Sequence, residues 1–162
     1  MESQTLITTF KDKNGRVWDL SLNFLTVERV KAQTEIDLLG YETQHTLAGD
    51  LAVDDVKLAQ TAAAILEPKL QEANVQPEAF ADAIASGDIL ADIFQAITAA
   101  IVNFTRPHRR ATVAGLYEKA NEAAHAAAGL AEKHLKAGTI DREISKQLDK
   151  LDAQLSGKVQ QS

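Results

Sequence analysis

The sequence predicts a mainly α-helical fold with a small N-terminal β-hairpin, an α+β arrangement in which a helical bundle is followed by a C-terminal amphipathic helix. Three observations lead to this prediction. Two apolar runs between Asp88 and Leu135 repeat in steps of three and four residues, the spacing of one helix face. Before them, a segment rich in β-formers turns at Asn14-Gly15. Alanine is abundant and only 5% of the residues are aromatic, which favours closely packed helices.

The composition limits the class of protein. A chain of 162 residues can form one domain with a sizeable core. It has no cysteine, which excludes disulfides and thiolate chemistry and fits a reducing cytoplasm. No apolar run approaches the length of a membrane span, and residues 1–4 lack the basic start of a secretion signal. The net charge is −6, opposite in sign to that of a general nucleic-acid binder. We therefore expect neither a membrane nor a nucleic acid as partner.

The N-terminal segment, residues 6–22, allows two hairpin registers. A two-residue Asn-Gly loop would place Phe10 opposite Asp19. A three-residue loop, Lys13-Asn14-Gly15, places Phe10 opposite Trp18 and puts Gly15 at the left-handed position. The second register gathers the large apolar residues on one face and is preferred. That face consists of Leu6, Phe10, Trp18, Leu20 and Leu22. Because a lone hairpin is marginal in water, the face should cover the helices or join a sheet in another subunit.

A short helix should follow the hairpin. Asn23 or Thr26 can cap it, and it should extend to about residue 34 with Val27 and Val30 facing inward. Residues 35–39 are expected to form a connector. Residues 40–49 have no clear period and are expected to form a loop.

Two more helices should precede the central pair. The first begins at Asp54 or Asp55, and Pro68 should bend it or end it near Glu67. The second, over residues 77–85, starts at Pro77. Their expected inward residues are Val56, Leu58, Ala59, Ala62, Ile65, Leu66, Leu70, Phe80 and Ile84.

The central pair of helices should organise the bundle. The first begins near Asp88, its expected N-cap, and ends before Thr105. Arg106 precedes a proline and should leave the α region, so the junction at 105–107 is either a tight corner or a kink. The pair is expected to carry the core residues Ile89, Leu90, Ile93, Phe94, Ile97, Ile101, Phe104, Val113, Leu116, Tyr117, Ala120, Ala124, Ala127, Leu130, Ala131 and Leu135.

The C-terminal segment carries one apolar stripe, made of Ile140, Ile144, Leu148, Leu151 and Leu155. The steps between these residues indicate an amphipathic or coiled-coil helix. We therefore divide the chain into a hairpin-plus-bundle domain over 1–137, an amphipathic helix over 138–156 and a disordered tail over 157–162. The stripe either closes the domain's own core or forms a surface that binds a partner helix. We name its five residues as the candidate partner-binding site.

No arrangement of residues indicates an enzyme. His45, His108, His125 and His134 form no recognised metal-ligand pattern, and Asp54, Asp55, Glu118, Glu122 and Glu132 are typical helix-surface carboxylates. There is no phosphate-binding glycine-rich motif and no nucleophile elbow. We expect no catalytic residue, no cofactor and no stoichiometric zinc.

One basic cluster, Arg106-Pro107-His108-Arg109-Arg110, lies at the junction of the central helices. It could contact a phosphate at a helix start. The favoured interpretation is a solvated junction whose arginines pair with nearby acidic residues, because the cluster is short and lacks interleaved aromatics.

The order of these features resembles a known family. The pattern F-x-D-x-x-G-R-x-W-x-L is present as Phe10, Asp12, Gly15, Arg16, Trp18 and Leu20. It is followed by Val27-Glu28-Arg29-Val30, Ile36-Asp37-Leu38-Leu39, Leu66-Glu67-Pro68, the Val75, Phe80 and Ile84 segment, and Phe104 to Arg110. Over about residues 6–116 the chain resembles small proteins encoded in the tail-gene region of tailed phages and prophages, which are similar to tail assembly chaperones.

The resemblance implies a function without catalysis. Such a protein would bind the tape measure protein in the host cytoplasm and keep that long helical protein soluble while the tail tube polymerises. Homo-oligomers are also compatible with it. The alternative is a structural phage protein, such as a tail or head–tail completion protein.

Overall fold

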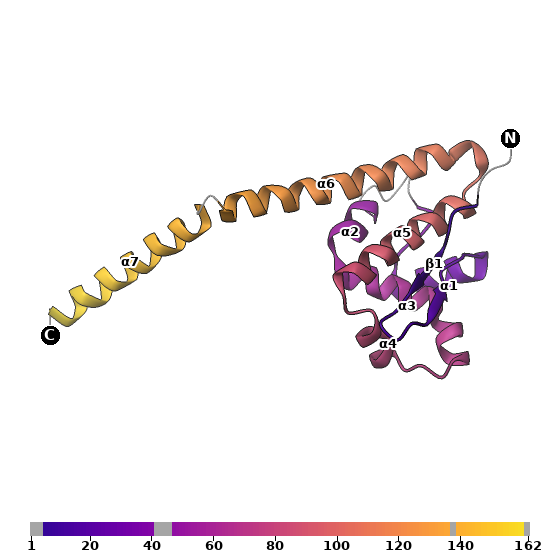
Figure 1. Ribbon diagram of the computed structural model, residues 1–162, viewed down its shortest axis with the longest axis horizontal. Coiled ribbons are helices and arrows are strands. Elements are labelled where there is room, and N and C mark those ends of the chain that lie inside the picture. The colour runs from indigo at the N-terminus through magenta and orange to yellow at the C-terminus, as the bar shows by residue number, and fades with distance from the viewer. Residues whose placement is uncertain (1–4, 41–46, 137–138, 161–162) are drawn as a thin grey trace. The chain divides into compact units, whose positions relative to one another are not determined.

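The computed structural model describes residues 5–40, 47–136 and 139–160. It confirms the predicted class, mainly α-helical with one small antiparallel hairpin at the N-terminus (Figure 1). The elements are β1 (Thr9–Lys11), β2 (Val17–Asp19), α1 (Phe24–Thr34), α2 (Leu47–Val53), α3 (Asp55–Glu72), α4 (Pro77–Ala83), α5 (Gly87–Phe104), a 3₁₀ turn η1 (Pro107–Arg109), α6 (Arg110–Lys136) and α7 (Thr139–Gln160). The chain forms two compact units, Met1–Glu122 and Ala123–Ser162.

The hairpin has the register of the three-residue loop. Phe10 pairs with Trp18, and Gly15 has a φ of 80°, the left-handed conformation that the loop requires. Asp12 fixes the loop from inside. Its Oδ1 accepts hydrogen bonds from the backbone N–H groups of Asn14 and Arg16, and its Oδ2 accepts one from Trp18 Nε1 at 2.9 Å. The acidic residue of the resemblance pattern therefore has a structural role.

The hairpin's apolar face covers helices of the same chain. Phe10, Trp18 and Leu20 are buried, and the Trp18 ring meets the Phe80 ring of α4 edge-on at 5.8 Å between centroids. Leu22 packs against the same core, but Leu6 was wrongly placed there, because its side chain is 43% exposed. Leu6 is held by its backbone instead, which exchanges two hydrogen bonds with the Asn103 side-chain amide.

Loss of the Asp12 carboxylate should destabilise the protein. Asp12→Ala leaves the buried Trp18 indole N–H and two loop N–H groups without their acceptor, and we expect a loss of about 2–3 kcal/mol in the free energy of unfolding. Urea unfolding measures it. Asp12→Asn keeps one carbonyl acceptor and should recover part of the loss. Equal urea midpoints for Asp12→Ala and the wild type would contradict this role.

Helix α5 is the centre of the core of the first unit. It packs against β1 and α3, which lie beside it in Figure 1, and buries Ile93, Ile97 and Ile101 almost completely. Its N-cap is Ser86, one residue before the helix, and the expected cap Asp88 lies in the first turn. The sequence analysis placed the N-cap two residues too late because Ser86, Gly87 and Asp88 are all residue types that occur at helix N-termini.

One expectation about α5 is corrected. Over its 18 residues it has a mean hydropathy of 1.3, so among the described residues it is a helix long and apolar enough to cross a membrane. The sequence prediction that no run reaches that length was wrong. Its buried residues, which include Ile93, Ala96, Ile97 and Ile101, match a helix that serves as the core of a folded unit.

Helix α3 continues through Pro68 to Glu72, so the proline does not end it. A proline has no N–H, and the carbonyl four residues earlier, that of Ala64, loses its helical donor. The Arg29 guanidinium of α1 replaces that donor. Its Nε and Nη2 lie 3.2 and 3.1 Å from Ala64 O, and Nη2 also donates to Ile65 O at 2.8 Å. A distant side chain thus completes the helix.

The junction of the central helices is a break, not a kink within one helix. Arg106 has an extended backbone (φ −55°, ψ 140°), as expected of a residue before proline, and Pro107 opens η1. Arg110 binds the end of α5, donating from Nε to Thr105 O at 2.9 Å and from Nη2 to Asn103 O at 3.2 Å. These carbonyls lie at a helix C-terminus, where a cation is favourable.

Helix α6 is less buried than predicted. Among its side chains only Val113 and Tyr117 are buried, whereas Leu116, Leu130 and Leu135 are 40–58% exposed. The helical period is right, but this apolar face does not serve as core beyond the first two turns. The two compact units accordingly divide after Glu122, earlier than the expected boundary at 137/138.

Smaller differences concern helix ends. Leu47–Gly49, expected in a loop, begin α2, and residues 41–46 of that loop lie outside the described residues. Val56, expected inward, is 66% exposed. Helix α7 continues to Gln160 and so includes residues 157–160 of the expected tail. Asn23 and Asp54 act as N-caps of α1 and α3, in agreement with one of the two alternatives given for each.

Candidate protein-binding surfaces

The predicted stripe lies on one helix, α7, and its described side chains are exposed. Ile144, Leu148, Leu151 and Leu155 are 51%, 56%, 53% and 60% exposed. The side chain of Ile140 lies outside the described part of the structure, although its backbone belongs to α7. Both interpretations of the stripe, closure of the domain's own core and a surface for a partner helix, stay predictions at this point.

The remaining faces of α7 are polar. Lys146, Asp149, Lys150 and Asp152 are exposed and carry both signs of charge. Since an aligned row of large apolar side chains is unfavourable in water, such a row bordered by polar residues is typical of a helix that binds another helix. The geometry is therefore that of an amphipathic helix.

The basic cluster is part of the fold. Arg110 binds the backbone carbonyls at the end of α5, and not the acidic side chains that the sequence interpretation proposed. Arg109 donates its backbone N–H to Arg106 O, which closes the 3₁₀ turn. The cluster thus connects α5 to α6, and the interpretation as a junction explains it without a phosphate.

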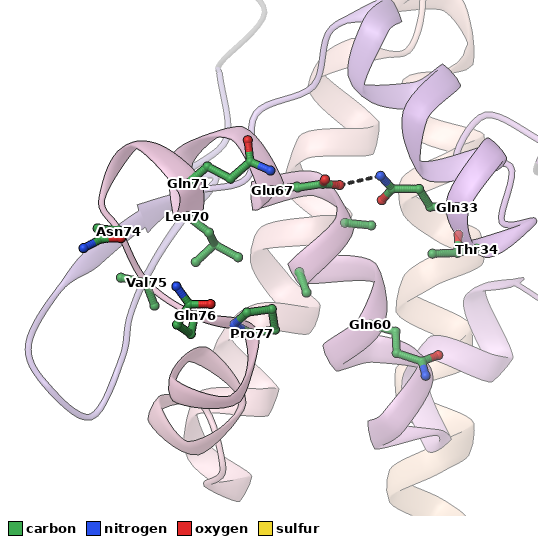
Figure 2. Close-up of a pocket in the computed structure, with 12 residues that line it drawn as sticks. Gln33, Thr34, Gln60, Glu67, Leu70, Gln71, Asn74, Val75, Gln76 and Pro77 are labelled. Carbon is green, nitrogen blue, oxygen red and sulfur yellow. Dashed lines mark hydrogen bonds between the residues drawn. The ribbon is translucent and has the colours of Figure 1, made fainter.

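A second surface, not found from the sequence, is a groove of about 900 Å³ in the first unit. Side-chain amides border it. Figure 2 shows Gln33 and Gln60 on one side and Gln71, Asn74 and Gln76 on the other. Its remaining lining residues are Thr34, Ala63, Ala64, Glu67, Leu70, Val75 and Pro77. These residues come from α1, α3, α4 and a turn, so no single segment of sequence carries a signal for the groove.

The lining of the groove is almost entirely uncharged. Glu67, the one ionisable residue in its lining, accepts a hydrogen bond from Gln33 Nε2 (Figure 2). Primary amides offer both donors and acceptors to neutral polar groups. The groove is therefore suited to binding such groups.

Elsewhere in the described chain, the two shifted titratable groups are explained by the fold. Burial raises the pKa of the Tyr117 phenol, whose ring packs 6.2 Å from that of Phe94. For Asp19, burial acts to raise the pKa, but hydrogen bonds from Thr8 Oγ1 and the Ser21 N–H outweigh it and lower the pKa below its usual value. Neither residue lines the groove or the stripe.

No metal centre is evident among the residues that the structure describes, where no group of three or more His, Cys, Asp or Glu converges. His108, His125 and His134 lie in this part, and His45 lies outside it. The absence of stoichiometric zinc stays a prediction, for metal analysis of the purified protein.

A comparison of this chain with protein-family models, curated proteins and solved structures found no match.

Proposed function

We propose that this chain is a non-enzymatic phage tail assembly chaperone that binds the tape measure protein in the host cytoplasm through α7. The observation that carries the proposal is the exposed stripe of Ile144, Leu148, Leu151 and Leu155. A tape measure protein is long and helical, and an amphipathic helix in solution can pack its apolar face against a complementary helix. The family resemblance of residues 6–116 supplies the identity of the client.

The folded unit supports the same proposal. Three residues of the resemblance pattern, Asp12, Trp18 and Arg110, have structural roles in the packed first unit. A protein that holds a client needs a stable body and an accessible apolar surface, and requires no polar active site. The arrangement of a packed unit and an exposed helix fits this requirement.

Binding to tape measure segments tests the proposal. We expect saturable binding in isothermal titration calorimetry. The variant that combines Leu148→Asp with Leu151→Asp should lose this binding, because both new carboxylates on the stripe would have to give up their hydration when the client helix covers them. Ala153→Asp is the matched control. It adds a charge to the polar face of the same helix, and should leave binding within about threefold, since exposed charges contribute little.

Equal binding by the double variant and the wild type would contradict the role of the stripe. Absence of saturable binding to any tape measure segment would contradict the chaperone function. Stoichiometric amounts of the protein in finished virions would favour the alternative, a structural tail or head–tail completion protein, because a chaperone is expected to leave.

A further inference from the structure

The hairpin loop holds an asparagine directly before a glycine, Asn14-Gly15, and both residues are exposed. In such a pair the backbone nitrogen of the glycine can attack the side-chain amide carbon of the asparagine, because the glycine has no side chain to hinder the approach. The other asparagines of the chain precede larger residues, in the pairs Asn23-Phe24, Asn74-Val75, Asn103-Phe104 and Asn121-Glu122. Asn14 is therefore the asparagine at which this reaction meets the least steric resistance.

The reaction needs no enzyme and no reactant other than water. The Gly15 nitrogen loses its proton and forms a bond to Asn14 Cγ, the bond from Cγ to Nδ2 breaks, and Nδ2 leaves with a proton as ammonia. Water then opens the cyclic succinimide at either of its carbonyl carbons. Opening at one of them leaves aspartate, and opening at the other leaves isoaspartate, in which the main chain runs through Cβ and Cγ. The net change is the loss of ammonia and the gain of water.

The folded loop opposes the first step of this reaction. The attacking nitrogen is engaged in the turn, because Gly15 N–H donates to Asp12 O at 3.1 Å. On either side of it, the N–H groups of Asn14 and Arg16 donate to Asp12 Oδ1 at 2.9 and 3.0 Å. The Asp12 carboxylate is also negatively charged, and a nearby negative charge disfavours the loss of the Gly15 proton. Attack therefore requires the hydrogen bonds to Asp12 to break.

Contacts with α4 hold the same loop closed. Lys13 N–H donates to Ala83 O at 2.9 Å. The other oxygen of the Asp12 carboxylate accepts from Trp18 Nε1, and the Trp18 ring packs edge-on against that of Phe80. A segment with buried anchors of this kind opens only in a small fraction of the molecules.

We propose that Asn14 is a site of spontaneous deamidation, and that the rate is set by opening of the loop that Asp12 closes. The proposal goes beyond the proposed function and does not depend on it. Isoaspartate at position 14 adds a methylene to the main chain of a three-residue loop, so the three N–H groups that Asp12 binds cannot all keep their acceptors. The modification should therefore weaken the hairpin that protects against it.

Peptide mapping by mass spectrometry tests the site. The full-length protein is kept in mildly alkaline buffer, folded or unfolded in guanidinium chloride, and the deamidated fraction at each asparagine is followed with time. In the unfolded chain Asn14 should react first. In the folded protein its rate should fall at least about tenfold, because only molecules with an open loop react. Earlier reaction of another asparagine in the unfolded chain overturns the proposal, as do equal Asn14 rates in the two states.

Substitution of Asp12 tests what closes the loop. Asp12→Ala should speed up the reaction of Asn14 in native buffer at least about tenfold, and Asp12→Asn, which keeps one carbonyl acceptor, should give an intermediate rate. Thr8→Ala is the matched control, because it removes the hydrogen bond to Asp19 at the other end of the hairpin and should leave the Asn14 rate nearly unchanged. Wild-type rates in both Asp12 variants, or equal acceleration by Thr8→Ala, contradict the role of Asp12.

The stability of aged protein tests the consequence. After prolonged incubation the wild type should be labelled by an isoaspartyl methyltransferase and should unfold at a lower urea concentration than fresh protein. Asn14→Gln keeps the primary amide and the backbone N–H that Asp12 binds, but its longer side chain would have to close a larger ring. It should show neither change. Equal labelling of the two aged proteins, or an aged wild type that is labelled at Asn14 and yet as stable as fresh protein, would contradict the account.

Discussion

Replacement of Trp18 by alanine is expected to lower the free energy of unfolding by about 3–5 kcal/mol, the usual range for removal of a fully buried tryptophan. The side chain is only 4% exposed, and its ring meets that of Phe80 in α4. Its indole N–H also holds the Asp12 carboxylate, so the substitution leaves a cavity and removes a buried hydrogen bond. The hairpin would lose its main contact with the helices.

Chemical unfolding, followed by circular dichroism at a helical wavelength, measures this loss. Val17→Ala is the matched control, because Val17 neighbours Trp18 in β2 but is 59% exposed. It should change the free energy of unfolding by no more than about 0.5 kcal/mol. Equal effects of the two substitutions, or a water-exposed fluorescence maximum for Trp18 in the folded protein, would show that the hairpin face is not buried.

Replacement of Arg29 by methionine is expected to cost about 1–3 kcal/mol, the penalty for a buried carbonyl without a donor. Methionine keeps the apolar stem but removes the hydrogen bonds to Ala64 O and Ile65 O. The cost depends on Pro68. In a Pro68→Ala background residue 68 regains its N–H, Ala64 O can be satisfied within the helix, and Arg29→Met should cost much less.

A double-mutant cycle of these two substitutions, measured by urea unfolding, isolates the coupling. A coupling energy of about 1 kcal/mol or more supports Arg29 as the replacement donor. Additive effects would mean that Arg29 contributes only packing or charge. Arg29→Lys adds a control, since it retains the charge but not the planar fork that reaches two carbonyls.

The features that were predicted correctly from the sequence are those that depend on residues close together in the chain. The hairpin register followed from the position of Gly15 and from the alternation that puts Phe10 opposite Trp18, and both are local. The helical periods of α1, α3 and α5 were equally visible. The apolar stripe of α7 was visible too, but its two interpretations stayed open, because periodicity shows that a face is apolar and does not show what covers it.

What depends on distant residues could not be predicted. Of the two outcomes predicted for Pro68, an end of the helix near Glu67 was wrong, since α3 continues to Glu72. Arg29, far away in the sequence, supplies the missing donor. The apolar residues at the end of α6 look like core by spacing, yet Leu130 and Leu135 are exposed. The amide-lined groove was missed since its residues come from three helices and a turn and share no period.

The separation between the packed core of residues 1–122 and the exposed stripe of α7 is tested most directly by thermal unfolding of the full-length variant that combines Leu148→Asp with Leu151→Asp. Because neither leucine is buried, the main unfolding transition should remain within about 1 °C of the wild type when both proteins are measured at the same low micromolar concentration. A fall of several degrees, the effect expected from core substitutions, would mean that the stripe belongs to the folded core and is no partner surface.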